Sequence, residues 1–248
     1  MKHIRTILGV AGLPTAFLLL CVTALSASAA APLKICLLSA SAEYESDKSL
    51  SEFQKYLEGK YNIVCHRAFG KDKGEGLPGL DSLATSDLMV VFTRRVKLPQ
   101  AQLEQLQKYI ASGKPIIGLR TASHAFDNYR DFDREVLGGG YKGHYTNSQV
   151  QVQLVVAQKQ HPVLAGVAPF TSRKLYKNPT HADNDTILLE GTIPDHKEPL
   201  AWVREHNGGR VFYTSLGVQE DFQQESFRRL LVNAIFWTTG REERASLR

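Results

Sequence analysis

Short apolar runs alternate with amphipathic segments through the first half of the chain. The runs at residues 33–40, 61–65 and 87–93 are each long enough for a buried strand. Between them, residues 47–59 and 99–113 place large apolar side chains at helical spacing and end at a glycine. This alternation predicts an α/β protein with a doubly wound, mainly parallel sheet, helices on both faces and right-handed crossovers.

The pattern is less regular in the second half. Residues 149–156 alternate polar and apolar side chains, which predicts a half-exposed strand at an edge of the sheet. Asn207-Gly208-Gly209 favours a hairpin turn, and a final apolar helix begins at residue 221 or 225 and ends near 238. Further strands are predicted at residues 185–189, 199–204 and 209–214.

The N-terminus resembles a targeting segment rather than part of the fold. Lys2 and Arg5 precede an apolar stretch, and Ala27-Ser28-Ala29 forms a small-residue cleavage pattern. We therefore expect residues 1–29 to be a signal peptide, with an uncleaved anchor as the alternative. Cleavage would leave one exported domain at 33–240, periplasmic or secreted, a charged tail at 241–248 and no stable membrane span.

Charge and cysteine content exclude several classes of protein. Loss of residues 1–29 removes Lys2 and Arg5 and no acidic residue, so the formal charge falls from +5 to +3. This charge is too small to indicate nucleic-acid binding. Cys36 and Cys65 lie in apolar runs without neighbouring metal ligands, so buried thiols are the default, while export leaves a disulfide open.

A polar cluster follows the predicted strand near residues 115–118. Arg120 lies where this strand should break, and Ser123 and His124 follow in a tight turn. Ligands of open α/β sheets bind at the carboxyl ends of strands, so all three residues are candidate site residues. The alternatives are structural: Arg120 in an ion pair with Glu43 or Asp221, and His124 packed within a helix.

Other predicted strand ends add to this candidate site. Arg94 and Arg95 follow the strand at 87–93, and Ser215 and Asp221 follow the strand at 209–214. If these strands are parallel, their polar residues open on one edge. Together they indicate a small polar ligand.

Two irregular stretches contribute further candidates. The glycine-rich segment 138–145 is predicted to be a mobile flap that brings Tyr141 and His144 over the site; an ordinary surface loop is the alternative. In the segment 175–181, Lys177 is a candidate substrate-binding cation, although an exposed lysine would look the same.

These residue types suggest acid–base chemistry. His124 or His144 would act as general acid or base, because histidine titrates near neutral pH. Arg120, with Arg94 or Arg95, would hold and polarise a substrate oxygen. The histidines lack metal-ligand spacing, so neither a metal nor another cofactor is expected. A non-catalytic binding module and a hydrolase with a serine nucleophile stay open as alternatives.

Four separated motifs carry a family resemblance. The segments 116–126, 137–144, 175–178 and 209–217 resemble those of the exported ThuA-like (trehalose-utilisation) proteins, over about residues 33–240. The resemblance implies a flavodoxin-like fold related to the class I glutamine amidotransferases. It also implies a trehalose-like or keto-sugar ligand that the protein acts on or binds, and it leaves homo-oligomerisation open.

The resemblance also excludes one activity. In the amidotransferases the turn after the central strand carries a nucleophilic cysteine, and the corresponding position here is Arg120. A guanidinium that stays protonated cannot be a nucleophile, so we expect no amidotransferase activity. In addition, Val218 follows Gly217 where the resemblance leads us to expect histidine, so no histidine-dependent step is assigned there.

Overall fold

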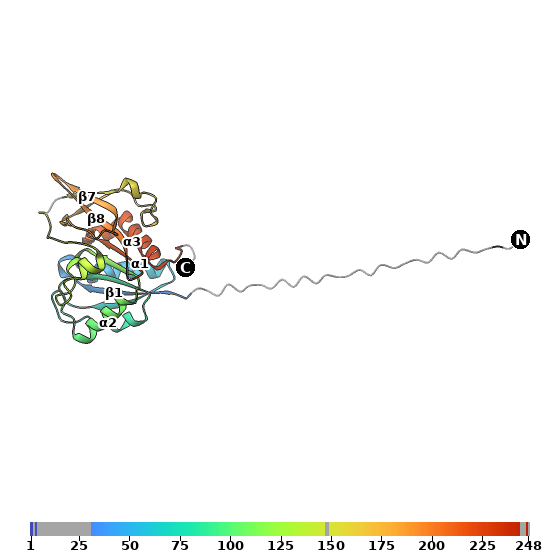
Figure 1. Cartoon of the computed structure of the whole chain (residues 1–248), viewed down its shortest axis with the longest axis horizontal. Helices are drawn as coiled ribbons and strands as arrows, with labels where there is room; N and C mark the ends of the chain where they lie inside the picture. Colours follow the sequence, from blue (N-terminus) through green and yellow to red (C-terminus); the bar gives the residue numbers. More distant parts are fainter. Residues whose placement is uncertain (2, 4–30, 147–148, 244–246, 248) are drawn as a thin grey trace.

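One nine-stranded sheet in the order β2-β1-β3-β4-β9-β8-β7-β5-β6 forms the centre of the protein (Figure 1). The computed structural model describes residues 1, 3, 31–146, 149–243 and 247, so the predicted signal peptide lies almost entirely outside the described residues. The strands are β1 Leu33–Ala40, β2 Ile63–Phe69, β3 Leu88–Thr93, β4 Ile116–Leu119, β5 Gln149–Leu154, β6 Phe170–Arg173, β7 Thr186–Ile193, β8 His196–His206 and β9 Gly209–Thr214.

The helices alternate with the strands only in the first half and at the C-terminus. The long helices are α1 Ser46–Lys60, α2 Gln100–Ala111 and α3 Glu225–Thr239. The short helices are η1 Ala42–Tyr44, η2 Leu80–Thr85, η3 Arg120–His124, η4 Asp133–Leu137, η5 Val156–Gln158, η6 Pro162–Leu164 and η7 Gln219–Gln223. No helix in the described part of the chain is long and apolar enough to cross a membrane.

The predicted α/β class is confirmed, and the sheet itself is mixed. Strands β2, β1, β3, β4 and β9 run parallel, whereas β8, β7, β5 and β6 each pair with their neighbours antiparallel. The expected parallel arrangement therefore holds for one half of the sheet. Strand β9 joins the two halves, because it pairs parallel with β4 and antiparallel with β8.

The prediction of an edge strand at residues 149–156 was wrong. Strand β5 lies between β7 and β6, and the four-residue β6 forms that edge. The alternation in β5 was real, since Val150 and Val152 are buried while the glutamines beside them are exposed. A half-buried strand need not be an edge strand, and β6 is too short to show a pattern of its own.

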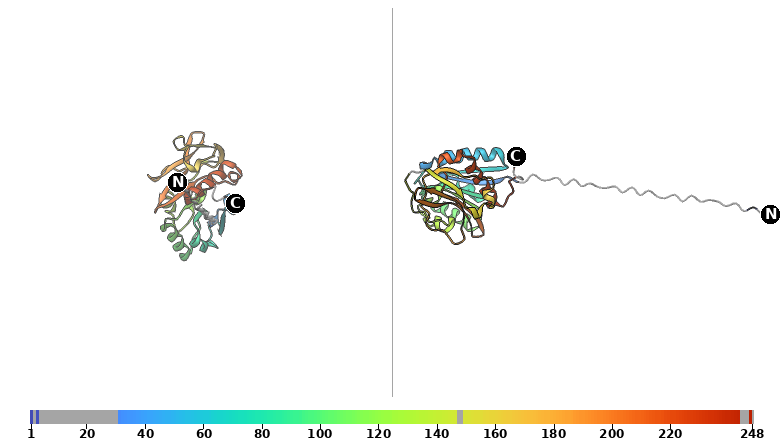
Figure 2. Two further views of the ribbon diagram at one scale, coloured as in Figure 1. Left: turned by 90° about the vertical axis from the view of Figure 1, so that its right-hand side faces the viewer. Right: turned by 90° about the horizontal axis from the view of Figure 1, so that it is seen from above.

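Helices lie on both faces of the sheet (Figure 2), and an apolar core fills the space on each face. Helices α1 and α3 pack on one face through residues such as Phe53 and Leu230. Helix α2 packs on the other face through Leu106 and Ile110. Because strand β3 is covered on both sides, all six of its residues are buried, as its uninterrupted apolar sequence predicted.

The open question about the cysteines is answered by the register of β1 and β2. Ile35 pairs with Cys65 and Cys36 with His66, so the two cysteines stand one step out of register and point to opposite faces. Both thiols are free and buried. Burial raises the pKa of Cys36 to about 11 and that of Cys65 to about 12, which keeps both protonated and unreactive.

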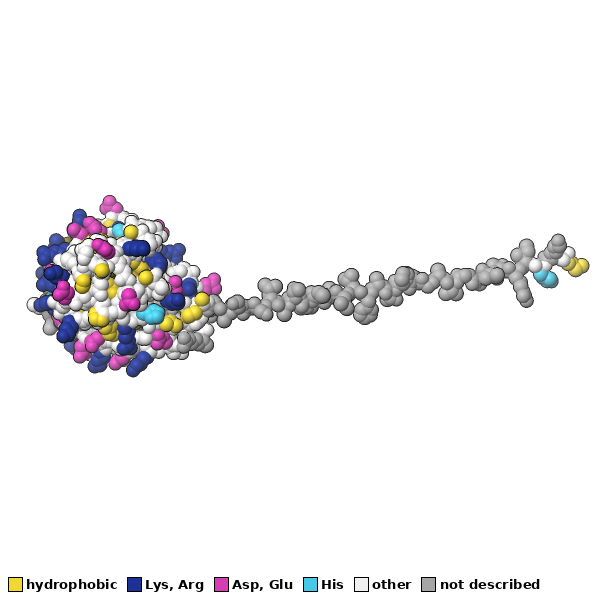
Figure 3. Space-filling view, turned by 90° about the horizontal axis from the view of Figure 1, so that it is seen from below, with side chains coloured by type: hydrophobic (Ala, Val, Ile, Leu, Met, Phe, Trp, Pro, Cys, Tyr) yellow, Lys and Arg dark blue, Asp and Glu magenta, His cyan; other side chains and the backbone are white. Residues whose placement is uncertain are grey.

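The surface carries charges of both signs. Lysine and arginine side chains lie interspersed with aspartate and glutamate on the face shown in Figure 3. This distribution agrees with the small net charge of the sequence.

Gly118, in the middle of β4, permits the close packing behind the site. A β-carbon there would lie 2.9 Å from Leu137 Cδ2 and 2.9 Å from Tyr213 Cδ2, both in the core. We expect Gly118→Ala to lower the free energy of unfolding by about 1–3 kcal/mol through overpacking. Denaturation in urea measures this change.

Gly59 provides the matched control, because it is exposed within α1 and a β-carbon there meets nothing within 4 Å. Gly59→Ala should raise the stability by about 0.4–1 kcal/mol. Equal effects of the two substitutions would contradict the packing assigned to β4.

Candidate functional site

The chain makes a sharp turn between β4 and η3, at Arg120. This residue has φ +45°, in the left-handed region, which costs a residue with a side chain roughly 1–2 kcal/mol. Tyr213 Oη donates a hydrogen bond of 2.8 Å to the Arg120 carbonyl, and Ser123 Oγ lies 3.3 Å from the same oxygen. The turn therefore has a strained strand-to-helix form, with an arginine at the strained position.

The Arg120 side chain is completely buried, at 0% exposure. Nη1 donates to the Ser215 carbonyl at 2.6 Å, and Nη2 donates to the Lys174 carbonyl at 3.1 Å and to Tyr44 Oη at 3.4 Å. The guanidinium lies between two rings, 4.2 Å from the centroid of Tyr44 and 4.6 Å from that of Tyr176. Its Nε has no hydrogen-bond partner among the described residues.

Neither structural ion pair considered for Arg120 is formed. Glu43 contacts Lys174 and Arg94, at 3.0 Å and 3.8 Å. Asp221 is also fully buried, and its carboxylate accepts hydrogen bonds from Ser172 Oγ and from the backbone N–H groups of residues 217 and 218. Burial raises the pKa of Asp221. This carboxylate thus links the turn after β9 to the edge strand β6.

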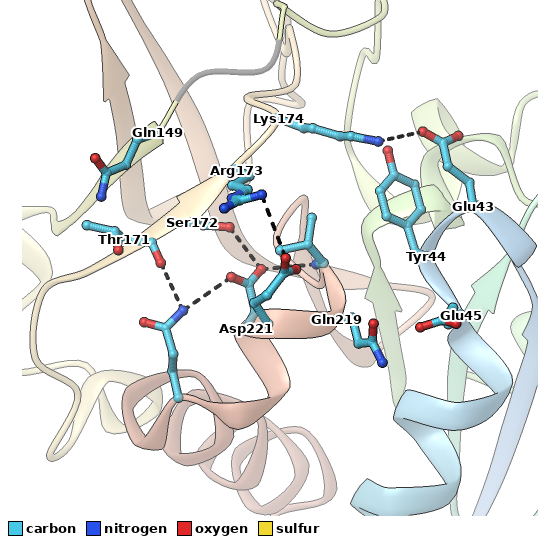
Figure 4. Close-up of a pocket in the computed structure, with 13 residues that line it drawn as sticks. Glu43, Tyr44, Glu45, Gln149, Thr171, Ser172, Arg173, Lys174, Gln219 and Asp221 are labelled. Atoms are coloured by element: carbon cyan, nitrogen blue, oxygen red, sulfur yellow. Dashed lines mark hydrogen bonds and ion pairs between the residues drawn. The ribbon is translucent and has the colours of Figure 1, made fainter.

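A cavity of about 770 Å³ opens beside this arrangement, between η1, β6 and η7 (Figure 4). Opposite charges lie side by side along it: Lys174 points to Glu43, and Arg173 lies 3.8 Å from Glu220. The lining consists of Glu43, Tyr44, Glu45, Gln149, Thr171, Ser172, Arg173, Lys174, Val218, Gln219, Glu220, Asp221 and Gln224. Val218 occupies the wall where a histidine was expected, so that wall carries no titratable group at this position.

His124 lies on the far side of Arg120, in a cluster of aromatic rings. Its ring stacks on Tyr141 at 4.7 Å between centroids and lies 6.3 Å from Tyr176. Ser123 Oγ is 3.1 Å from His124 Nδ1. Burial, reinforced by the positive charges of Arg95 and Arg94, lowers the pKa of His124 to about 4. At neutral pH this imidazole is therefore uncharged, and it can take part in hydrogen bonds as a neutral ring.

The glycine-rich segment does carry Tyr141 to the site, and buried contacts hold it there. Asp133 Oδ2 accepts a 2.9 Å hydrogen bond from the backbone N–H of Tyr141. A β-carbon on Gly140 would collide with Thr180 Oγ1. Burial raises the pKa of Asp133 to about 6.

A second cavity, of about 370 Å³, adjoins His124. It is lined by Arg95, Ser123, His124, Phe126, Asp127 and Arg130. The end of β3 reaches both cavities, because Arg94 contacts Glu43 of the large cavity while the next residue, Arg95, lines the small one.

Six predicted site residues line neither cavity: Arg94, Arg120, Tyr141, His144, Lys177 and Ser215. His144 is exposed, and its Nδ1 lies 2.8 Å from the Tyr145 carbonyl. Lys177 Nζ lies over the ring of Tyr145, 4.6 Å from the centroid. Ser215 reaches the site only through its backbone carbonyl, which binds Arg120.

Of the residues that line the large cavity, only Asp221 was among the predicted site residues. Tyr44 and Lys174 are among those missed, and so is Tyr176, which packs on Arg120. Tyr44 stands among the polar residues after the first strand, which was a usable signal. Tyr176 and Lys174 flank Leu175 in a motif where the sequence drew attention to Lys177 instead. Among the described residues, no group of three or more histidine, cysteine, aspartate or glutamate side chains could hold a metal ion.

The contributions of His124 and Asp133 to the free energy of unfolding should depend on pH in opposite directions. The lowered pKa of His124 means that the unfolded chain binds more protons, so its contribution to stability rises from about pH 4 to 6.5 and is lost on acidification. The raised pKa of Asp133 means that the folded chain binds more protons, so its contribution falls as the pH rises from 3.8 to about 6.

In the wild type, His124 makes the unfolding free energy rise between about pH 4.5 and about pH 7. We expect His124→Asn to reduce this rise by on the order of 2 kcal/mol. Asp133→Asn should increase the rise by a similar amount, and the double variant should return close to the wild-type slope. Urea unfolding at the two pH values measures the slopes, and unchanged slopes would contradict the burial assigned to these groups.

Comparison with solved structures shows the same fold in other proteins. A putative ThuA-like protein from Bacteroides uniformis ATCC 8492 is 18% identical, with a TM-score of 0.65 over 85% of this chain and 93% of that one. A putative ThuA-like protein from Parabacteroides merdae ATCC 43184 gives the same identity and score over 85% and 91%. A β-galactosidase from Bacillus circulans is 13% identical, with a TM-score of 0.57 over 85% of this chain and 32% of that one.

Sequence comparisons give the family. A search of the curated proteins finds no match. The family model ThuA, described as trehalose utilisation, matches residues 41–238, which cover every element from η1 to the last turn of α3. This protein therefore belongs to the ThuA family.

Proposed function

We propose that the protein binds a carbohydrate at the carboxyl ends of its parallel strands. The observation that carries this proposal is the lining of the 770 Å³ cavity, in which amide, hydroxyl and oppositely charged groups alternate beside Tyr44. Such a wall offers many hydrogen-bond donors and acceptors, which suits a polyhydroxylated ligand. The volume lies within the range of small-molecule sites.

The family description supports a trehalose-like disaccharide or its keto derivative as the ligand. We also propose that the parallel half of the sheet is a flavodoxin-like, doubly wound unit related to the glutamine amidotransferases. The order β2-β1-β3-β4-β9 and the helices on both faces support this assignment. Arg120 occupies the turn after β4, where the amidotransferases carry their nucleophilic cysteine, and this supports the loss of thiol chemistry.

Two lysines provide a matched test of the cavity. Lys174 and Lys177 each lie over a tyrosine ring, at 4.9 Å and 4.6 Å, but only Lys174 lines the cavity. We expect Lys174→Met to weaken the binding of trehalose or keto-trehalose about tenfold, the loss of one charge-assisted hydrogen bond. Lys177→Met should leave the affinity unchanged.

Titration calorimetry measures both affinities. The carbonyl of Lys174 that binds Arg120 belongs to the backbone, so the substitution should spare this contact. A loss of affinity in Lys177→Met alone would move the site to the glycine-rich segment, and a failure of both sugars to bind would refute the carbohydrate proposal.

Catalysis by His124 is a second candidate, supported by its 3.1 Å contact with Ser123 Oγ. A neutral imidazole beside the cleft would take a proton from a substrate hydroxyl. We expect any turnover of trehalose or its keto derivative to fall at least about 100-fold in His124→Ala, the typical contribution of a general base. Product analysis measures this, and equal turnover by the wild type and the variant would exclude His124 as the base.

We further propose that residues 1–29 are a signal peptide and that the mature, exported protein consists of the domain at 33–240 with a charged tail at 241–248. The small-residue pattern Ala27-Ser28-Ala29 supports this cleavage position. The mass of the protein recovered from a host that secretes it would show whether cleavage follows Ala29.

A further inference from the structure

Arg95 is held in a fixed place but has no charged partner. It follows β3 with φ +49°, and its backbone N–H donates a 2.8 Å hydrogen bond to the His124 carbonyl. The next N–H, of Val96, donates to the carbonyl of Ala125 at 2.9 Å. The Arg95 side chain is exposed and forms no ion pair with any residue in the described part of the chain. The structure thus presents a free guanidinium from a backbone clamped at two points.

The small cavity beside Arg95 is built for a ligand group of limited size. Phe126 and Ser123, at 3% and 6% exposure, form buried parts of its lining, and the half-buried His124 lies beside them. Its volume of about 370 Å³ is at the lower end of the range for small-molecule sites. The lining thus combines buried side chains with the exposed side chain of Arg95.

The charges around this cavity sum to a single positive charge. Arg130 is neutralised by Asp127, since their side chains lie 3.2 Å apart. His124 is uncharged at neutral pH because burial lowers its pKa to about 4. Arg94 is engaged by Asp72 at 3.3 Å and by Glu43 at 3.8 Å. Only the charge of Arg95 is therefore uncompensated.

The two cavities differ in this respect. In the large cavity the cations Lys174 and Arg173 face glutamates. The large cavity therefore presents no uncompensated cation, whereas the small cavity presents one. One guanidinium fork matches one carboxylate in charge and in bidentate geometry. A phosphate would bring a second negative charge toward Asp127.

We propose that the small cavity binds a carboxylate, and that the ligand of this protein is a sugar acid, an aldonic or uronic acid, whose carboxylate is bound by Arg95. This inference rests on the proposed binding of a carbohydrate and adds the chemical class of that carbohydrate. Ser123 Oγ and the neutral His124 ring would serve the hydroxyl groups next to the carboxylate.

Calorimetric titration of the wild-type protein with glucuronate, glucuronamide, glucose and glucose 6-phosphate tests the proposal. Glucuronate and glucuronamide differ only in the charge of one group. We expect glucuronate to bind about tenfold more tightly than the amide, the gain of one charge-assisted hydrogen-bonded pair. Glucose should bind like the amide, and glucose 6-phosphate should bind less tightly than glucuronate.

Two arginine variants locate the effect. Arg95→Gln should remove the preference for glucuronate over glucuronamide while keeping the affinity for the amide. Arg134→Gln is the matched control, because Arg134 is exposed, pairs with Asp131 at 2.8 Å and lines neither cavity. It should leave the preference unchanged.

The outcomes separate this inference from the proposed function. Equal binding of glucose, glucuronate and glucuronamide would overturn the sugar-acid assignment and leave carbohydrate binding intact. Tighter binding of glucose 6-phosphate than of glucuronate would indicate that the cavity binds a phosphate, and it would also overturn the sugar-acid assignment. A preference that survives in Arg95→Gln would place the carboxylate elsewhere. Failure of all four sugars, together with trehalose and keto-trehalose, to bind would refute the proposed function and this inference together.

Discussion

The burial of one guanidinium organises the functional end of this protein. Arg120 joins the elbow after β4 to the segments after β6 and β9 through the carbonyls of Lys174 and Ser215, and to η1 through Tyr44. Transfer of a cation from water to the protein interior costs several kcal/mol unless hydrogen bonds and other favourable contacts replace its hydration. Two carbonyls, a phenol and two aromatic faces supply these contacts here, without an ion pair. Segments far apart in sequence are thereby held at mutually fixed positions.

The arginine also determines the chemistry of the turn after β4. A nucleophile must project into the cleft, whereas the Arg120 side chain turns into the protein and is covered by Tyr44 and Tyr176. The strained turn is kept because Tyr213 and Ser123 still bind its carbonyl. The surfaces available to a ligand lie beside the buried arginine. One is the large cavity next to Lys174, and the other is the small cavity next to His124. Burial and the nearby charges of Arg95 and Arg94 lower the pKa of His124, so its ring stays neutral.

Much of the fold was readable in the sequence because local patterns carry it. The apolar runs gave β1 and β3, the helical spacing gave α1, α2 and α3, and the Asn-Gly-Gly turn gave the β8–β9 hairpin. The edge position of β6 was not readable, since four residues without an apolar run carry no periodic signal. The register that separates Cys36 from Cys65 was equally hidden, because it depends on pairing between strands rather than on either strand alone.

The sequence by itself determined the residue types at the strand ends, including an arginine at the elbow and polar residues around it, because strand ends follow from local hydrophobic patterns. Only the tertiary structure decided which of them meet. It placed Lys174 rather than Lys177 on the cavity, put Asp221 with Ser172 instead of Arg120, and left Arg95 without an ion pair in the described part of the chain. Those choices depend on how β6, β9 and β3 come together across long stretches of chain, and charge pairing follows from distances in space that no local sequence pattern records.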